Sequence, residues 1–189
     1  MRVIAAATED DMVATFLRAE LGSSRHAGQV VAALAAEGLD RSLVERPDTA
    51  DPAANAARRT VLAAYREYPD GGVFTDLPAD TEWLWAALGP EELLQVRYIN
   101  WDYWIEVSGG TRRPLDAIPR IGGSPIYREI AAAVAGGRLP PALILIGRPP
   151  GIDLVVLEGH VRLTALTMAI EHLPPELTVL VGLAPTMDK

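Results

Sequence analysis

Glu158, Gly159, His160 and Arg162 are the residues best suited to chemistry, because an acid, a glycine, an imidazole and a guanidinium fall within five positions. They follow the apolar run 154–157 and precede a stretch with helical periodicity, which predicts a strand, a tight glycine turn and a helix N-terminus. The free N–H groups of a helix start favour an anion, and an arginine can fork onto two phosphate oxygens. We therefore expect phosphate binding at Gly159 and Arg162.

Two of these residues are candidates for catalysis. Glu158 could hold a magnesium ion or accept a proton from a hydroxyl, and His160 could donate a proton or contact phosphate, because its ordinary pKa lies near neutrality. Structural interpretations stay open beside these roles: Glu158 as a carboxylate that complements the helix dipole, His160 as a hydrogen-bonded surface residue, and Arg162 as a salt-bridge partner.

A second candidate segment combines hydroxyls, glycines and arginine, and it is expected to add phosphate contacts. Its residues are Ser108, Gly109, Gly110, Thr111 and Arg112. A plain surface turn is the alternative interpretation of this segment. Aromatic residues come immediately before it, with Tyr98, Trp101, Tyr103 and Trp104 inside seven positions. They form either part of the core or a wall beside a ligand; in the second case Trp101, Asp102 and Trp104 line a substrate pocket.

Several other chemistries are excluded by residue types. The chain has no cysteine, which removes disulfides, thiolate zinc sites and cysteine nucleophiles. Its three histidines lack the spacing of a helical zinc pair, and it has neither a Walker loop nor a Gly-x-Ser-x-Gly elbow. The single lysine is Lys189, so phosphate charge must be met by arginine, backbone N–H groups or metal. The expected cofactor is Mg²⁺ with ATP or another nucleoside triphosphate.

The elements that must position these residues are expected from apolar periodicity, caps and turn signals. Helices are predicted at 9–21, around 30–38, and at 53–68, 81–88, 90–96, 124–134 and 161–170. Buried strands are predicted at 142–146, 154–157 and 177–183. The fold class is therefore α/β (α+β), with an α-rich region 1–97 and a mixed core in 98–189, expected to form one compact unit.

Charge and hydropathy indicate which classes of binding partner are disfavoured. Residues 1–97 carry 9 arginines and 16 acids, a net charge of −7, and residues 98–189 carry 8 basic residues and 9 acids, a net charge of −1. Neither region has the basic excess of a duplex-binding surface, so nucleic acid is a disfavoured partner. No export signal or membrane-length apolar run is present, so we expect a cytoplasmic protein without a membrane partner. A homodimer is left open.

The run Leu-Val-Val-Leu-Glu-Gly-His-Val-Arg-Leu-Thr-Ala at 154–165 resembles the nucleotide-binding motif of the ParB/sulfiredoxin superfamily. The resemblance covers about residues 112–184, where a helix, a glycine break, the pair Pro140-Pro141 and a strand precede the motif in the order of that fold. The resemblance implies a ParB/sulfiredoxin-like core in the C-terminal half. The chain as a whole is similar to a group of bacterial proteins without an assigned activity.

Branches of that superfamily differ after the motif glycine. Sulfiredoxins place a catalytic cysteine at the position of His160, so their activity is excluded here. Partition proteins have Gly-Glu-Arg-Arg and continue into a DNA-binding helix-turn-helix region, whereas this sequence ends soon after Arg162. The motif is most similar to the Asp-Gly-His-His-Arg motif of the free-serine kinases, although Val161 stands where that motif has its second histidine.

The residues and the resemblance together predict a nucleotide-binding protein. The expected activity is phosphoryl transfer from a nucleoside triphosphate to a small molecule, or nucleotide hydrolysis, which makes a small-molecule kinase or an NTPase the favoured enzyme. A non-catalytic module that responds to a nucleotide is the alternative. A DNA-binding or nuclease role is the weakest of the three.

Overall fold

The chain forms two compact units in the computed structural model. The model describes residues 1–188, and of Ile152 it describes the backbone only. The helical unit is Ala7–Leu77, and the sheet unit is Met1–Ala6 together with the chain from Pro78. Lys189 lies outside the described residues. The division differs from the single compact unit and the boundary after residue 97 that we expected, because strands on both sides of the helical unit enter one sheet.

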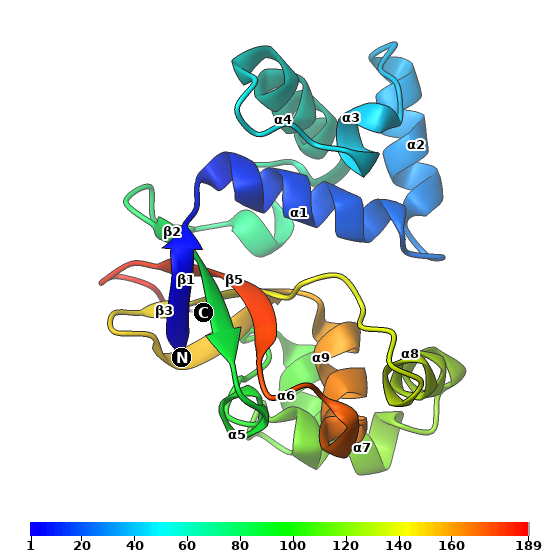
Figure 1. The fold of residues 1–189 in the computed structure, drawn as a ribbon, viewed down its shortest axis with the longest axis vertical. Helices are drawn as coiled ribbons and strands as arrows, with labels where there is room; N and C mark the ends of the chain where they lie inside the picture. The colour runs from blue at the N-terminus through cyan, green and yellow to red at the C-terminus, as the bar shows by residue number, and fades with distance from the viewer. Residues whose placement is uncertain (189) are drawn as a thin grey trace. The chain divides into compact units, whose positions relative to one another are not determined.

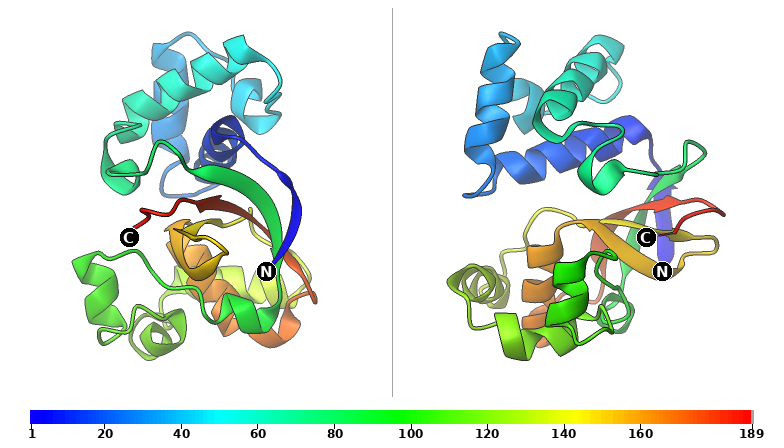
Figure 2. Two further views of the ribbon diagram at one scale, coloured as in Figure 1. Left: turned by 90° about the vertical axis from the view of Figure 1, so that its left-hand side faces the viewer. Right: turned by 180° about the vertical axis from the view of Figure 1, so that it is seen from behind.

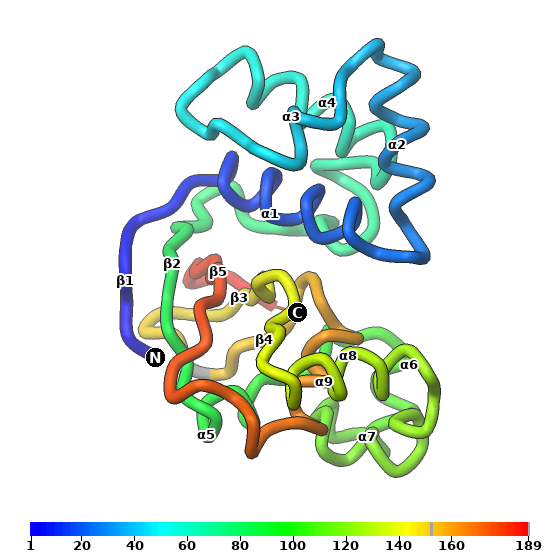
Figure 3. Tube along the Cα trace, turned by 45° about the vertical axis from the view of Figure 1, so that its right-hand side comes forward, coloured from blue at the N-terminus to red at the C-terminus, as the bar shows by residue number. Residues whose placement is uncertain are grey.

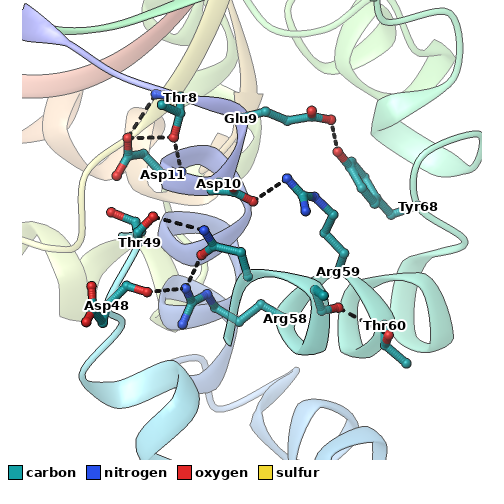
Figure 4. Close-up of polar contacts among 12 residues, drawn as sticks. Thr8, Glu9, Asp10, Asp11, Asp48, Thr49, Arg58, Arg59, Thr60 and Tyr68 are labelled. Atoms are coloured by element: carbon teal, nitrogen blue, oxygen red, sulfur yellow. Dashed lines mark hydrogen bonds and ion pairs between the residues drawn. The ribbon is translucent and has the colours of Figure 1, made fainter. Parts of the chain in front are cut away.

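The helical unit packs helices around a small apolar core. Its elements are α1 (Glu9–Leu21), α2 (Ala27–Ala36), α3 (Ser42–Glu45), α4 (Pro52–Arg66) and the 3₁₀ turn η1 (Gly72–Phe74). The helix predicted at 9–21 is confirmed, and a capping box begins it: the Asp11 N–H donates to the Thr8 hydroxyl at 3.2 Å, and the Thr8 N–H donates to the Asp11 carboxylate at 2.8 Å (Figure 4). Buried core residues include Met12, Phe16, Leu17, Val30, Leu34, Val61, Leu62 and Phe74.

A buried arginine joins α4 to the loop before it. Arg58 is 1% exposed, and its guanidinium donates to the main-chain oxygen of Asp48 at 2.6 Å (Figure 4) and to that of Leu43 at 3.2 Å. A third bond goes to the Asn55 side-chain oxygen. These acceptors would be left unsatisfied in a buried site without the guanidinium.

Arg58→Met is therefore expected to lower the free energy of unfolding by roughly 1.5 to 3 kcal/mol, the cost of losing buried hydrogen bonds to a charged group. The matched control is Arg59→Met, because Arg59 is a half-exposed neighbour that pairs with Asp10 at 2.5 Å. Loss of that pair is expected to cost no more than about 1 kcal/mol. Urea unfolding compares the two variants, and equal losses would contradict a structural role for Arg58.

The sheet unit is built on one mixed sheet, which contains five strands within residues 1–188 (Figure 1). They are β1 (Arg2–Ala6), β2 (Glu82–Leu88), β3 (Ile144–Arg148), β4 (Ile152–Glu158) and β5 (Leu177–Leu183). The order across the sheet is β1-β2-β5-β3-β4; β3 and β5 are parallel, and the other neighbours are antiparallel. The central strands β3 and β5 are almost wholly buried.

Helices of the sheet unit gather on one side of that sheet (Figure 2). They are α5 (Pro90–Leu93), α6 (Asp102–Val107), α7 (Pro114–Ile121), α8 (Pro125–Ala135), α9 (His160–Met168) and the 3₁₀ turn η2 (Ile170–His172). Helix α9 packs against α7 and α8. The order α8, β3, β4, α9, β5 confirms the mixed α/β core predicted in this part of the chain. No helix among the described residues has the length and apolar character needed to cross a membrane.

The helix predicted at 81–88 is wrong, because this stretch is strand β2. It pairs along its full length with β5 and over four positions with β1, which Figure 3 lets the reader follow. Trp83 lies opposite Gly182, where a Cβ atom would come within 2.9 Å of the indole, so the glycine gives the ring room to cross β5. Strand pairing therefore overrides the helical tendency of a segment rich in alanine and leucine.

Candidate functional site

The turn between β4 and α9 is made by a single residue. Gly159 has φ +106°, in the left-handed region that residues with a side chain rarely adopt. A Cβ atom here would lie 2.7 Å from Cδ2 of Leu143 and 3.1 Å from the guanidinium of Arg162. Glycine is thus required both by the backbone and by its neighbours, and it places Glu158 and His160 on either side of a sharp turn.

Arg162 lies over this turn and holds three segments together. Its Nη1 donates to the main-chain oxygens of Pro141 at 2.9 Å and Ala142 at 2.7 Å, and its Nη2 donates to Oε1 of Glu158 at 2.7 Å. Both charged side chains of the pair are largely buried, which strengthens their attraction. The salt-bridge interpretation of Arg162 is therefore observed, and the guanidinium keeps one Nη2 proton and the Nε proton for a further acceptor.

His160 lies in a cluster of near-parallel aromatic rings. Its ring centroid is 5.0 Å from that of Trp104 and 6.3 Å from that of Trp101, with interplanar angles of 13° and 12°. The side chain is buried, and its Nε2 atom has no hydrogen-bond partner among the described residues. Burial, followed by the nearby charge of Arg162, lowers the pKa of His160 to about 3. The imidazole is therefore neutral near pH 7, and a ligand bound beside it would meet an uncharged ring.

A pair of hydroxyls fastens this aromatic segment to α9. Thr164 donates its single hydroxyl proton to the main-chain oxygen of His160 at 2.9 Å, so the 2.6 Å bond between Thr164 and Tyr98 has Tyr98 as its donor. Burial raises the pKa of the Tyr98 phenol, which keeps it protonated for this bond. Tyr98 also stacks on Trp104 at 4.4 Å. The rings are thus held in register with the first turn of α9.

The first turn of α9 offers donors for an anion. The N–H of Leu163 is the first to bond within the turn, to the main-chain oxygen of Gly159 at 2.7 Å. Within residues 1–188, the N–H groups of His160, Val161 and Arg162 have no hydrogen-bond acceptor. These three groups stand at the positive end of the helix dipole, which stabilises negative charge placed there.

Comparison with known proteins provides no family for this chain. Neither the family models, nor the curated proteins, nor the solved structures contain a match to it. The chemistry of the site is therefore inferred from its own residues and geometry.

The loop predicted to add phosphate contacts makes its described bonds mainly with its own neighbours. The Ser108 hydroxyl donates to the main-chain oxygen of Trp104 at 2.7 Å and accepts from the Arg112 N–H at 2.8 Å. The Thr111 hydroxyl donates to the Asp116 carboxylate at 2.7 Å. Gly109 and Gly110, both with positive φ, close the C-terminal end of α6. These bonds do not bring the loop to α9, and its phosphate role stays a prediction.

The two glycines of this loop also line a surface hollow. Its lining is Ile105, Glu106, Val107, Gly109, Gly110 and Arg120. Arg120 donates to the main-chain oxygen of Glu106, so its guanidinium is held at the hollow by α6.

Arg112, the arginine of the predicted loop, has a lowered pKa. Burial of its guanidinium is the main cause, and the nearby charge of Arg97 lowers the pKa further.

Six of the predicted site residues meet in the structure. They are Glu158, Gly159, His160, Arg162, Trp101 and Trp104. Asp102 begins α6 and is exposed beside Trp101. Sequence reasoning did not include Tyr98 and Thr164 in the site; the aromatic run and the helical spacing of Thr164 from His160 were the available signals.

Proposed function

We propose that this protein binds a nucleotide through phosphates held at the first turn of α9. The observation that carries the proposal is the row of three N–H groups after Gly159, which has no acceptor among residues 1–188 and stands beside the Arg162 guanidinium. Oriented backbone donors of this kind, together with a guanidinium that retains two N–H groups, match the oxygen-rich shape and charge of phosphates. The resemblance of the motif to the ParB/sulfiredoxin superfamily agrees with this proposal.

The proposed reaction is phosphoryl transfer to a small molecule, or hydrolysis of the nucleotide. Glu158 is the residue proposed to serve the attacking hydroxyl or water, because its carboxylate lies one residue before the anion-binding turn. It is now paired with Arg162, so a phosphate that competes for the guanidinium would free the carboxylate. Positioning and charge stabilisation are what phosphoryl transfer chiefly requires from a protein.

The donor set fits Mg²⁺ brought in with a nucleotide. Magnesium commonly takes one or two carboxylates from the protein and its remaining ligands from phosphates and water. Glu158 can supply one carboxylate oxygen, and the residues that the structure describes hold no group of three or more His, Asp or Glu that could cage a metal alone. When bound, the metal would neutralise phosphate charge.

A non-catalytic module that responds to a nucleotide is the second candidate. The observation that favours it is the 2.7 Å bond between Glu158 and Arg162, because it occupies the carboxylate oxygen Oε1 that a general base would use. In this case the Glu158 to Arg162 pair would only shape the turn, and the bound nucleotide would be neither cleaved nor transferred.

Calorimetric titration with ATP, CTP and GTP in the presence of Mg²⁺ is expected to show binding of at least one nucleotide. Glu158→Gln should keep binding within a few-fold, because glutamine can still accept from Arg162, and should lower phosphate release or transfer at least about 100-fold. The matched control is Glu171→Gln, an exposed residue of η2, which should change neither quantity.

The outcomes separate the proposals. Absence of binding to all three nucleotides would overturn the nucleotide site itself. Binding with equal turnover in Glu158→Gln and the unchanged protein would remove Glu158 from the chemistry, and binding without any turnover would favour the non-catalytic module.

A further inference from the structure

We propose that the exposed indole of Trp101 receives the base of the bound nucleotide by ring stacking, so that the ligand of this site is a heteroaromatic nucleotide and not a simple phosphate ester. This inference rests on the proposed anion site at α9. It adds a second subsite, which recognises the part of the ligand that carries no charge.

The rings of the cluster share one orientation. Trp101 and Trp104 are both within 13° of the plane of His160, and Tyr98 is within 18° of it. Near-parallel rings present their faces in one direction, and a planar base can extend such a stack. The cluster therefore has the geometry of a stacking platform and differs from the tilted packing that joins Phe16 and Phe74 in the helical unit.

Trp101 is the member of the cluster that reaches the surface. It is 45% exposed, whereas Trp104 is 8% exposed. Covering a large apolar ring that is open to water is favourable, so a ligand that covers Trp101 binds more tightly. The inner rings pack beside it, because Trp101 and Trp104 are both nearly parallel to the imidazole of His160.

The platform is held in place before any ligand arrives. The main-chain oxygen of Trp101 accepts from the N–H groups of Trp104 at 2.9 Å and Ile105 at 3.0 Å, which fixes the start of α6. The bond from Tyr98 to Thr164 fixes the other end of the segment to α9. A platform that is ordered in advance loses little conformational entropy on binding.

One residue links the platform to the anion site. His160 contributes its ring to the cluster and its main-chain N–H to the row of free donors at the first turn of α9. Its Nε2 atom, in a side chain only 9% exposed, has no partner among the residues described. Through its ring and its main-chain N–H, His160 therefore connects the stacking cluster to the anion site.

The test compares ATP with inorganic triphosphate, which carries the charge but has no ring. Trp101→Ala is expected to weaken ATP binding roughly 5- to 150-fold, the range for removal of one base-stacking aromatic, and to change triphosphate binding less than about twofold. Tyr103→Ala is the matched control, because Tyr103 is a similarly exposed aromatic of α6 whose ring meets Trp104 edge-on. It should leave the affinity for both ligands unchanged.

Different failures overturn different statements. If the unchanged protein binds ATP no more tightly than triphosphate, or if Trp101→Ala weakens both ligands equally, the stacking inference is overturned and the anion site stands. If the unchanged protein binds neither triphosphate nor any of ATP, CTP and GTP, the proposed function itself is overturned. Trp101→Leu, which keeps apolar volume and removes the aromatic face, replaces the alanine variant if that one does not fold, and it must show the same loss confined to ATP.

Discussion

Replacing Gly159 by alanine is expected to lower the free energy of unfolding by roughly 2 to 5 kcal/mol. Two costs add. The φ of +106° is unfavourable for any residue with a Cβ atom, and that atom would lie 2.7 Å from the side chain of Leu143, which is fully packed in the core. Urea unfolding measures the loss.

Gly137→Ala separates these two costs. Gly137 also has a positive φ, +82°, but a Cβ atom there would meet nothing within 4 Å. Only the backbone cost is expected, about 1 to 2 kcal/mol. Equal losses in the two variants would show that the contact with Leu143 relaxes freely and that the turn before α9 tolerates a side chain.

Acidification is expected to destabilise the protein through His160, by about 1.4 kcal/mol per pH unit below pH 6.5, or about 3 kcal/mol by pH 4.5. The pKa of His160 in the folded protein, about 3, lies below the ordinary value of 6.5. As the pH falls, the unfolded chain therefore binds this proton first. The stability that belongs to the neutral ring is complete above pH 6.5 and is lost progressively as the pH falls toward 3.

His160→Phe keeps a planar ring in the cluster and removes the proton, so its stability should fall less steeply with pH than that of the unchanged protein. The free energy of unfolding, measured by urea between pH 7 and pH 4.5, gives both slopes, and their difference cancels the titration of the carboxylates. His172→Gln is the control, because it removes a histidine from an exposed position. Parallel slopes for His160→Phe and the unchanged protein would contradict a buried neutral imidazole.

Local signals were enough to predict α1, α4, α8 and α9 and the buried strands β3, β4 and β5, whereas α6, which carries Trp104, and α7, which packs against α9, were not predicted. Thr8 and Asp11 begin α1 where their spacing indicated, and the apolar run at 177–183 is strand β5. Strand β2 (Glu82–Leu88) could not be predicted in this way, because its conformation depends on β1 and β5, which are distant in the sequence. Residue types alone do not show that Gly182 gives room to Trp83.

The candidate site was predictable where chemistry follows from neighbours along the chain. Glu158, Gly159 and Arg162 share one turn, so their proximity follows from a strand that runs into a helix. The carbonyls of Pro141 and Ala142, which hold Arg162, come from a segment about 20 positions earlier and carry no side-chain signal. The burial of His160 likewise depends on Tyr98 and Trp104, and it changes the expected pKa of the imidazole from near neutrality to about 3.

The pairing of β1 with β2 has a consequence for how the chain folds. Ala6 lies opposite Leu84, so the whole of residues 7–83 forms the connection of what is otherwise an antiparallel hairpin. Closing a flexible loop of that length costs roughly 2 to 3 kcal/mol more than closing a tight turn. The cost falls if the intervening helices form first, because a folded insertion leaves fewer free links between the two strands. The edge of the sheet would then be completed late, after both units have found their cores.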